Sequence, residues 1–257
     1  MAYFNCFYAK RGSDIPDGST VTPTDDMQTL LHCAGIKNKN YTTLNELLAD
    51  STTLLAVISD SNAVDYLVRS TTWASGMTSD QVAMGDIGNN NYASNTLLAD
   101  STWKSAIWSS PYRESVLNLK NPTMTSNNTP SGEASASTRN SDAYKAFDNN
   151  SATMWYAGSG LTLPQYVQYA FPSKVKIYGV DITPYYSNRA FLKDFTITNE
   201  DNTTLLSETM PNSNVKQSYL FTTVEDSSTY RLNGLNNYAN NSDIEVCEIL
   251  LLGRADV

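Results

Sequence analysis

Oxygen-bearing side chains are concentrated in KAFDNNSATMW, residues 145–155, which ends on a large aromatic ring. Asp148, Asn150 and Thr153 lie at spacings of two and three residues, close enough to share one loop. Hard cations such as Ca²⁺ take about six to eight oxygen ligands from carboxylates, carbonyls and waters. The loop is therefore either a hydrogen-bonded polar turn or half of a cation site. In the second case, another part of the chain must supply the remaining ligands.

The bulk composition disfavours several classes of partner. The chain has 257 residues, enough for one large domain or two smaller ones. Its formal net charge is -9, whereas nucleic acids and anionic lipid surfaces are bound through clustered Lys and Arg, so we expect neither partner. No run of 18 or more apolar residues is present, so no membrane-spanning helix is expected. The first residues lack a secretory leader, which predicts retention in a cytosol until release.

The pattern of the chain changes near residues 118–133, NLKNPTMTSNNTPSGE, where turn-forming residues replace any periodicity. Before this boundary, residues 42–119 repeat a short theme of polar cap residues followed by apolar residues at helical offsets. The hexapeptide LLADST even occurs twice, at 47–52 and 97–102. The expected N-caps recur at steps of roughly nine or ten residues. They are Ser51, Ser61, Ser70, Ser79, Ser101 and Ser110.

Helices of about two turns are unstable alone, because nucleation costs more than so few hydrogen bonds return. We therefore expect residues 42–119 to pack as a short-helix repeat that oligomerises or anchors the chain to a partner. Residues 1–41 are predicted to form an arm that docks onto a partner, with a local strand of the same domain as the alternative. The expected buried stripe comprises Leu47, Leu48, Leu54, Leu55, Ile58, Val64, Leu67, Val68, Leu97, Leu98, Ile107, Val116 and Leu117.

After the boundary, the periodicity changes to two. In YVQYAF, residues 166–171, the side chains of Val167, Tyr169 and Phe171 alternate with those of their neighbours. The segments KVKIYGVDI, FTITN, YRLNGL and IEVCEILLLG continue this pattern, with turn signals between them. Short strands at such spacings predict an antiparallel β-sandwich or barrel over residues 120–257.

Six segments of this second half follow one another as SGEASAST, AYKAFDNNSATMW, QYVQYAF, KIYGVDITP, LKDFTIT and IEVCEILLLG. In this order, from about Pro122 to Gly253, they resemble the discoidin or coagulation factor 5/8 type C domain, a galactose-binding-like carbohydrate-binding module. The resemblance implies an eight-stranded, jelly-roll-like sandwich with Trp155 in its core. The fold class expected for the whole chain is therefore α+β multidomain, a short-helix region followed by an all-β discoidin-like sandwich.

The resemblance also implies a structural ion near the AFD loop, calcium or, in its place, sodium. Carried over by position, its ligands are the carbonyls or side chains of Lys145, Asp148, Asn150, Thr153, Cys247 and Glu248. Two carboxylates with several carbonyls form a ligand set that a hard cation accepts. Asp148 and Glu248 lie 100 positions apart, so the ion would join the first and last strands. A polar turn without an ion remains the alternative.

Ligand-binding members of this family use loops at one end of the sandwich. The corresponding carbohydrate-binding candidates are Tyr156, Tyr185, Tyr186, Arg189, Asn237, Tyr238 and Asn240. Aromatic faces with Arg and Asn donors match the apolar face and hydroxyl rim of a sugar. Residues 120–257 contain no histidine, which sugar binders of this family often place among these loops. Its absence argues against galactose in particular.

Short repeated helices, an Asn- and Thr-rich composition and a terminal discoidin-like module together resemble structural proteins of tailed bacteriophages, such as fibre and decoration proteins. This resemblance implies a virion protein made in the host cytoplasm. Its N-terminal half would bind capsid or tail proteins and oligomerise, while the sandwich attaches weakly and multivalently to host-surface carbohydrate. The alternative is a virion connector whose sandwich packs against proteins and binds no sugar. An enzyme is not expected, because the first half has no nucleophile elbow, His pair or carboxylate dyad.

Overall fold

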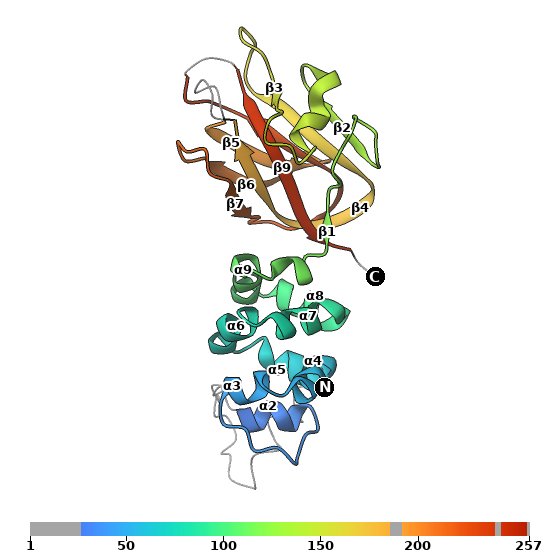
Figure 1. The fold of residues 1–257 in the computed structure, drawn as a ribbon, viewed down its shortest axis with the longest axis vertical. Helices are drawn as coiled ribbons and strands as arrows, with labels where there is room; N and C mark the ends of the chain where they lie inside the picture. The colour runs from blue at the N-terminus through green and yellow to red at the C-terminus, as the bar shows by residue number, and fades with distance from the viewer. Residues whose placement is uncertain (1–26, 186–191, 240–242, 256–257) are drawn as a thin grey trace. The chain divides into compact units, whose positions relative to one another are not determined.

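The computed structural model describes residues 27–185, 192–239 and 243–255, and it divides into a helical unit and a β unit between Val116 and Leu117 (Figure 1). The sequence places this boundary three residues later, at 119/120. Of the predicted arm, residues 1–26 lie outside the described residues. Residues 27–41 include a helix that packs within the helical unit, so this part is not a separate arm.

The helical unit is a succession of short helices. They are α2 (Met27–Cys33), α3 (Leu44–Leu48), α4 (Ser51–Ser59), α5 (Ser61–Leu67), α6 (Thr71–Thr78), α7 (Gln81–Asn89), α8 (Asn91–Ala99), α9 (Ser101–Ser109) and the 3-10 helix η1 (Arg113–Ser115). From α4 to α9, each helix begins ten residues after the previous one. None of the described helices is long and apolar enough to cross a membrane.

The N-caps of this repeat differ from those expected by one residue at most positions. Ser70 caps α6 as predicted, but Ser51, Ser61 and Ser101 are the first helical residues rather than caps. The capping side chains accept hydrogen bonds from the backbone of the first turn and belong to Asp50, Asp60, Asp80, Asn90 and Asp100. A carboxylate is also favoured here by the positive end of the helix dipole.

Ser79 and Ser110 have other roles. Ser79 follows α6 and its hydroxyl donates to the carbonyl of Ser75. Ser110 ends α9, and its hydroxyl donates to the carbonyl of Thr78 at 2.5 Å while accepting from the amide of Tyr112. Neither serine begins an α-helix. Both satisfy carbonyl groups that the end of a helix leaves without partners.

Burial follows the same ten-residue period. In α4, α6, α7 and α8, the third, fourth, seventh and eighth residues after each cap are buried. The expected stripe is confirmed at most positions, including Leu54, Ile58 and Leu97. It is wrong at Leu55, which is 50% exposed, and Leu48 and Val68 are only half-buried. Leu55 occupies the fifth position of its repeat, which faces away from neighbouring helices.

The short helices stack as a superhelix with three helices per turn. From α2 to α9, each helix contacts the third one along the chain, as in the pairs α2 with α5, α4 with α7 and α5 with α8, and most also contact the next one. Figure 1 shows α3, α6 and α9 above one another in such a column. Cap side chains connect successive turns, since the amide of Asn90 donates to the carbonyl of Ile58 at 3.1 Å. One superhelical turn therefore takes about thirty residues of sequence.

The β unit is entirely antiparallel in its described strands, which confirms the predicted fold class of helices followed by a β-sandwich. The strands are β1 (Leu119–Lys120), β2 (Glu133–Ala136), β3 (Trp155–Tyr156), β4 (Gln165–Pro184), β5 (Asp194–Asn199), β6 (Thr204–Thr209), β7 (Gln217–Leu220), β8 (Asp226–Gly234) and β9 (Glu245–Arg254). The 3-10 helix η2 (Asn140–Ala146) lies between β2 and β3.

The long strand β4 belongs to both layers of the sandwich. Its first half pairs with β2 and β8, and β8 continues to β5 and β6. After an irregularity between Ala170 and Val175, its second half pairs with β9 and β7. The core between the layers is apolar and includes Trp155, Val167 and Tyr169, as the alternating pattern predicted. β3 pairs with the start of β9, and η2 contacts both strands.

Candidate functional site

The AFDNNSAT loop follows η2 and is anchored by the buried side chain of Phe147. Asp148 accepts hydrogen bonds from the Thr153 hydroxyl at 2.7 and 2.9 Å and from the Asn150 amide at 3.0 Å. Asn149 has a φ of 51°, a left-handed conformation that asparagine tolerates better than most residues. This turn gathers the Asp148 carboxylate, the Thr153 hydroxyl and the Asn150 carbonyl into one small volume, since the Thr153 hydroxyl oxygen also lies 2.9 Å from that carbonyl oxygen.

The second carboxylate comes from the last strand. Glu248 of β9 accepts from the Asn150 amide at 2.5 Å and lies against Asp148. Burial first, and the neighbouring Asp148 second, raise the pKa of Glu248 to about 7. The predicted convergence of these two distant carboxylates is therefore confirmed. Both side chains are half-buried, and two like charges in contact at such a position are unfavourable unless a proton or a cation lies between them.

The other predicted ligands lie around the same pair. The Cys247 thiol is 3.2 Å from the carbonyl of Thr153, and burial raises the pKa of this thiol to about 11, so it stays protonated. The Lys145 ammonium forms an ion pair with Asp142 at 2.8 Å. It therefore does not pair with the carboxylates of Asp148 and Glu248. Among the described residues, no group of three or more His, Cys, Asp and Glu side chains could hold a metal ion. A cation here would depend on backbone carbonyls as well as on the two carboxylates.

The residues predicted to bind carbohydrate differ in their exposure and in whether they lie within the described residues. Tyr186, Arg189 and Asn240 lie outside the described residues, and Tyr185 is half-buried at the end of β4. Asn237 is fully buried, and its side chain donates to the carbonyl of Asp243 and accepts from the amide of Ala239. Asn237 therefore holds its own loop and cannot contact a sugar, which corrects its predicted role.

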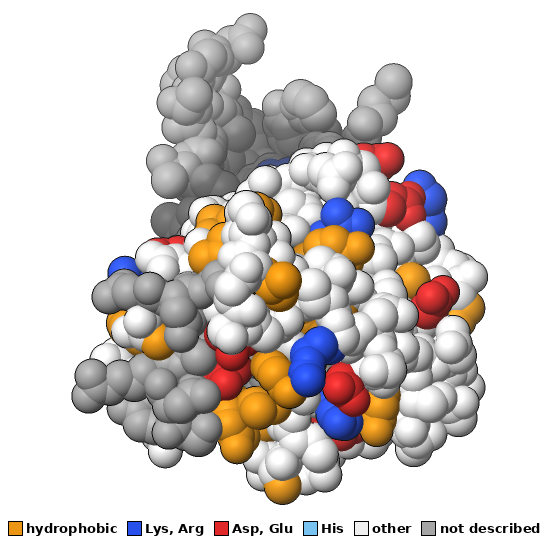
Figure 2. Space-filling view, turned by 90° about the horizontal axis from the view of Figure 1, so that it is seen from above, with side chains coloured by type: hydrophobic (Ala, Val, Ile, Leu, Met, Phe, Trp, Pro, Cys, Tyr) orange, Lys and Arg blue, Asp and Glu red, His pale blue; other side chains and the backbone are white. Residues whose placement is uncertain are grey.

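Tyr238 and Tyr156 are half-buried and present part of their rings. The Tyr238 hydroxyl donates to the carbonyl of Met210 at 2.6 Å, and the Lys193 ammonium lies 5.7 Å from its ring centroid. Each tyrosine is thus a ring fixed at the surface beside a cationic side chain. Figure 2, which views the molecule from above the orientation of Figure 1, shows a face on which groups of hydrophobic side chains adjoin Lys and Arg on a largely uncharged surface.

Arg139 is a site residue that the sequence did not reveal. Its guanidinium carbon lies 3.7 Å from the centroid of the Tyr156 ring, and the side chain is exposed. Its backbone has a φ of 48°, a left-handed conformation that an arginine seldom adopts. The loop that carries it is fixed by the Thr138 hydroxyl, which donates to the carbonyl of Ala157 at 2.9 Å. A lone arginine in a Ser- and Thr-rich loop gives no signal in the sequence that it will meet Tyr156.

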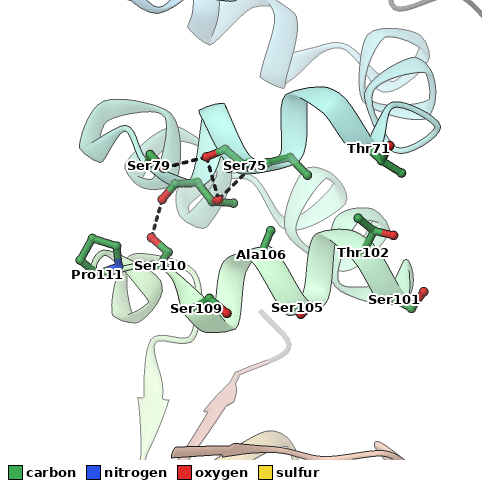
Figure 3. A pocket seen from close by; sticks show the side chains of 12 residues that line it. Thr71, Ser75, Ser79, Ser101, Thr102, Ser105, Ala106, Ser109, Ser110 and Pro111 are labelled. Atoms are coloured by element: carbon green, nitrogen blue, oxygen red, sulfur yellow. Dashed lines mark hydrogen bonds between the residues drawn. The ribbon is translucent and has the colours of Figure 1, made fainter.

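The helical unit has a polar groove of about 640 Å³ between α6 and α9 (Figure 3). Its lining consists almost entirely of small side chains: Thr71, Ala74, Ser75, Thr78, Ser79, Ser101, Thr102, Ser105, Ala106, Ser109, Ser110 and Pro111. Figure 3 shows Ser75 and Ser79 along α6 and Ser110 at the end of α9. The hydroxyls of Ser79 and Ser110 donate hydrogen bonds to backbone carbonyls. The groove follows from small residues at the facing positions of two stacked helices.

No family model and no curated protein match the sequence. Among solved structures, the chain is similar to the family 32 carbohydrate-binding module of NanJ from C. perfringens in complex with galactose. This match has 20% identity and a TM-score of 0.43, and it covers 52% of this chain and 99% of the module. CpGH89CBM32-5 from Clostridium perfringens, in complex with GalNAc-beta-1,3-galactose, has 14% identity and a TM-score of 0.43, and the match covers 51% of this chain and all of that one.

A third similar structure is chitosan-binding module 1 of a chitosanase/glucanase from Paenibacillus sp. IK-5. Its identity is 20% and its TM-score is 0.41, and the match covers 52% of this chain and all of the module. At TM-scores below 0.5, these similarities carry no function over to this chain. The function has to be inferred from its own site residues.

Proposed function

We propose that the β unit is a carbohydrate-binding module whose site includes the Arg139 and Tyr156 pair. The observation that supports this proposal is the stack itself, in which a rigid aromatic ring and an open guanidinium meet at the surface. Such a pair offers a sugar an apolar aromatic surface and planar hydrogen-bond donors within the width of one sugar ring. The Tyr238 ring beside Lys193 repeats the combination.

The remaining part of the function is also proposed. The chain is a bacteriophage virion structural protein, of fibre or decoration type, whose helical unit anchors it to capsid or tail proteins and oligomerises. Many copies then convert weak binding of host-surface carbohydrate into firm attachment. The support is the helical superhelix, because stacked repeats have open ends and broad surfaces that suit assembly. No catalytic role is proposed.

Glycan binding is tested with the full chain on a multivalent glycan array. We expect binding to a subset of glycans, weakened about tenfold or more, or about 1.4 kcal/mol, by Tyr156→Ala and by Arg139→Ala. Arg113→Ala is the matched control, because Arg113 also stacks on an aromatic ring, that of Trp108 at 4.6 Å, but belongs to the helical unit. If no glycan is retained even at high valency, the module is a packing element and the protein a purely structural connector.

We also propose that the loop of Asp148 and Glu248 holds a structural calcium ion, with sodium as its substitute. Two half-buried carboxylates in contact, the carbonyls of Asn150 and Thr153 and the hydroxyl of Thr153 form a ligand set of hard oxygen atoms. The cation would supply the positive charge that the pair lacks and would join the η2 loop to β9. The alternative is a polar turn stabilised without an ion by the hydrogen bonds from Asn150 and Thr153.

Calcium binding predicts that chelator lowers the melting temperature of the β unit and that added calcium restores it. A ligand present at one hundred times its dissociation constant stabilises the folded state by about 2.7 kcal/mol. Asp148→Ala should reproduce the loss, and chelator should then have no further effect. Asp142→Ala, which removes a nearby carboxylate paired with Lys145, should leave the calcium response unchanged. A melting temperature that neither chelator nor calcium changes would favour the polar turn without an ion.

A further inference from the structure

The outer face of the layer formed by β2, β4, β8, β5 and β6 carries two rows of polar side chains across the strands. The pairing register defines the members of each row, because residues opposite each other on neighbouring strands share a face. One row comprises Ser137, Tyr166, Asn233, Thr196 and Ser207. The other comprises Ser135, Gln168, Arg231 and Thr198.

These two rows contain a single charged side chain, Arg231. Surfaces that serve only solubility interleave Lys, Arg, Asp and Glu, whereas this face presents hydroxyls, amides and one aromatic ring. Charged residues return in the flanking positions, where Glu133 lies opposite Ala170 and Asp194 opposite Thr209. Apart from Arg231, the two rows therefore form an uncharged area that is bounded by charged residues. Its hydroxyl and amide groups are of the kind that form hydrogen bonds with a polyhydroxylated ligand.

Arg231 is held in a fixed orientation on this face. Its guanidinium carbon lies 4.4 Å from the centroid of the Tyr166 ring, and its Nε donates to Gln168 Oε1 at 2.7 Å. Gln168 is itself oriented by its bond to the Ser135 hydroxyl at 3.0 Å. The Nη1 group is 3.4 Å from the side-chain oxygen of Asn202, and Nη2 has no partner among the described residues. Arg231 forms no ion pair with any described carboxylate, although the chain carries a net charge of -9.

Acceptor groups flank this cation. Asn233 donates through Nδ2 to the hydroxyls of Thr196 and Thr198, both at 3.2 Å, so its orientation is fixed and its Oδ1 is turned away from these contacts. The Tyr166 hydroxyl has no hydrogen-bond partner among the described residues. Neighbouring strands are about 4.8 Å apart, so these groups are spaced within the breadth of a few sugar rings.

We propose that this sheet face is a second carbohydrate-binding surface, separate from the pair of Arg139 and Tyr156, and that it binds an acidic glycan with a sugar carboxylate on Arg231. A pre-oriented guanidinium binds a carboxylate through two parallel hydrogen bonds, and a lysine does not reproduce this geometry. Tyr166, Asn233 and the row of hydroxyls contact the neutral rings on either side. The preference for a carboxylate follows from charge complementarity with the one cation of the patch.

The test is calorimetric titration of the full chain with oligomannuronate and with the same oligosaccharide after its carboxyls are reduced to alcohols. We expect the uronate to bind at least tenfold more tightly than the reduced form. Arg231→Gln should abolish this difference, and Arg231→Lys should restore it only in part. Arg113→Gln is the matched control and should leave uronate binding unchanged, because Arg113 also lies against an aromatic ring but belongs to the helical unit. Arg139→Gln is measured as well, because it reports uronate binding at the pair of Arg139 and Tyr156. If Arg231→Gln unfolds, Arg231→Lys keeps the charge and still tests the site, because a partial loss in Arg231→Lys together with full binding in Arg139→Gln assigns the carboxylate to Arg231.

The proposal is overturned by any of three results. The uronate does not bind, the reduced form binds equally well, or the loss appears in Arg139→Gln and not in Arg231→Gln. The last result would place the carboxylate at the pair of Arg139 and Tyr156. Failure of neutral glycan binding at that pair, in contrast, leaves this surface unaffected.

Discussion

At the scale of single residues, the contact between Asp148 and Glu248 connects the stability of the β unit to pH. In the ion-free protein, burial and the neighbouring carboxylate hold the pKa of Glu248 near 7, against about 4.5 for an ordinary glutamate. The folded state therefore binds a proton more tightly than the unfolded chain between these two values. The free energy of unfolding falls as the pH rises through this window and levels off above it.

We expect the melting temperature of the chelated protein to fall between pH 5 and pH 8, in part because Glu248 must ionise within the fold. Glu248→Gln removes this titration while keeping the shape of the side chain, so the fall should be smaller in this variant. Glu208→Gln, at an exposed position of β6, serves as the control for losing one carboxylate. Thermal unfolding followed by circular dichroism measures the effect. An identical fall in Glu248→Gln and the unaltered protein would contradict it.

At the residue scale, the sequence predicts the loop of Asp148, Asn150 and Thr153 better than the contact between Arg139 and Tyr156. Asp148, Asn150 and Thr153 are neighbours in the chain, so their spacing alone indicates a shared loop. Glu248 required the family resemblance, because nothing local connects β9 to that loop. The contact of Arg139 with Tyr156 depends on a left-handed backbone turn and on the placement of β3, neither of which leaves a pattern in the sequence.

At the scale of elements, the caps set the register of the helical repeat. Asp80 accepts from the amide of Ala83 at 2.9 Å and so satisfies one of the donors that begin α7. Asp80→Ala should lower the free energy of unfolding by about 1 kcal/mol, the usual cost of losing a capping side chain. Ser79→Ala is the matched control at the residue the sequence suggested as the cap, and it should cost less. Urea denaturation separates the two variants, and equal losses would mean that the cap register is wrong.

The caps also show why a sequence reading can shift by one residue. Asp50, Asp60 and Asp100 are each followed directly by a serine, and both residue types are favoured at an N-cap. The ten-residue period is visible in the chain, and so is the alternation that predicts the strands of the β unit. The choice between two adjacent cap residues depends on backbone angles that only the packed helices determine.

At the scale of the whole molecule, the order of a helical unit and a β unit is predictable, because each buries its apolar residues with a different period. The superhelix is not predictable in the same way. A period of ten residues fixes where each helix begins and which positions are buried, but the number of helices per turn depends on the angles between them. The sequence also predicts an arm over residues 27–41, because α2 lies outside the ten-residue period. Only the contact of α2 with α5 shows that this segment belongs to the helical unit.

Three helices per turn also determine how such a chain can change in length. The two copies of LLADST lie fifty residues apart, so the helices that follow them, α4 and α9, belong to different columns. Identical peptides are thus accepted on different sides of the stack, which makes one decapeptide an interchangeable module. Gaining or losing a single module would rotate the helices that follow it by a third of a superhelical turn. A gain of three modules would instead lengthen the stack by one full turn, and each following helix would stay in the same column.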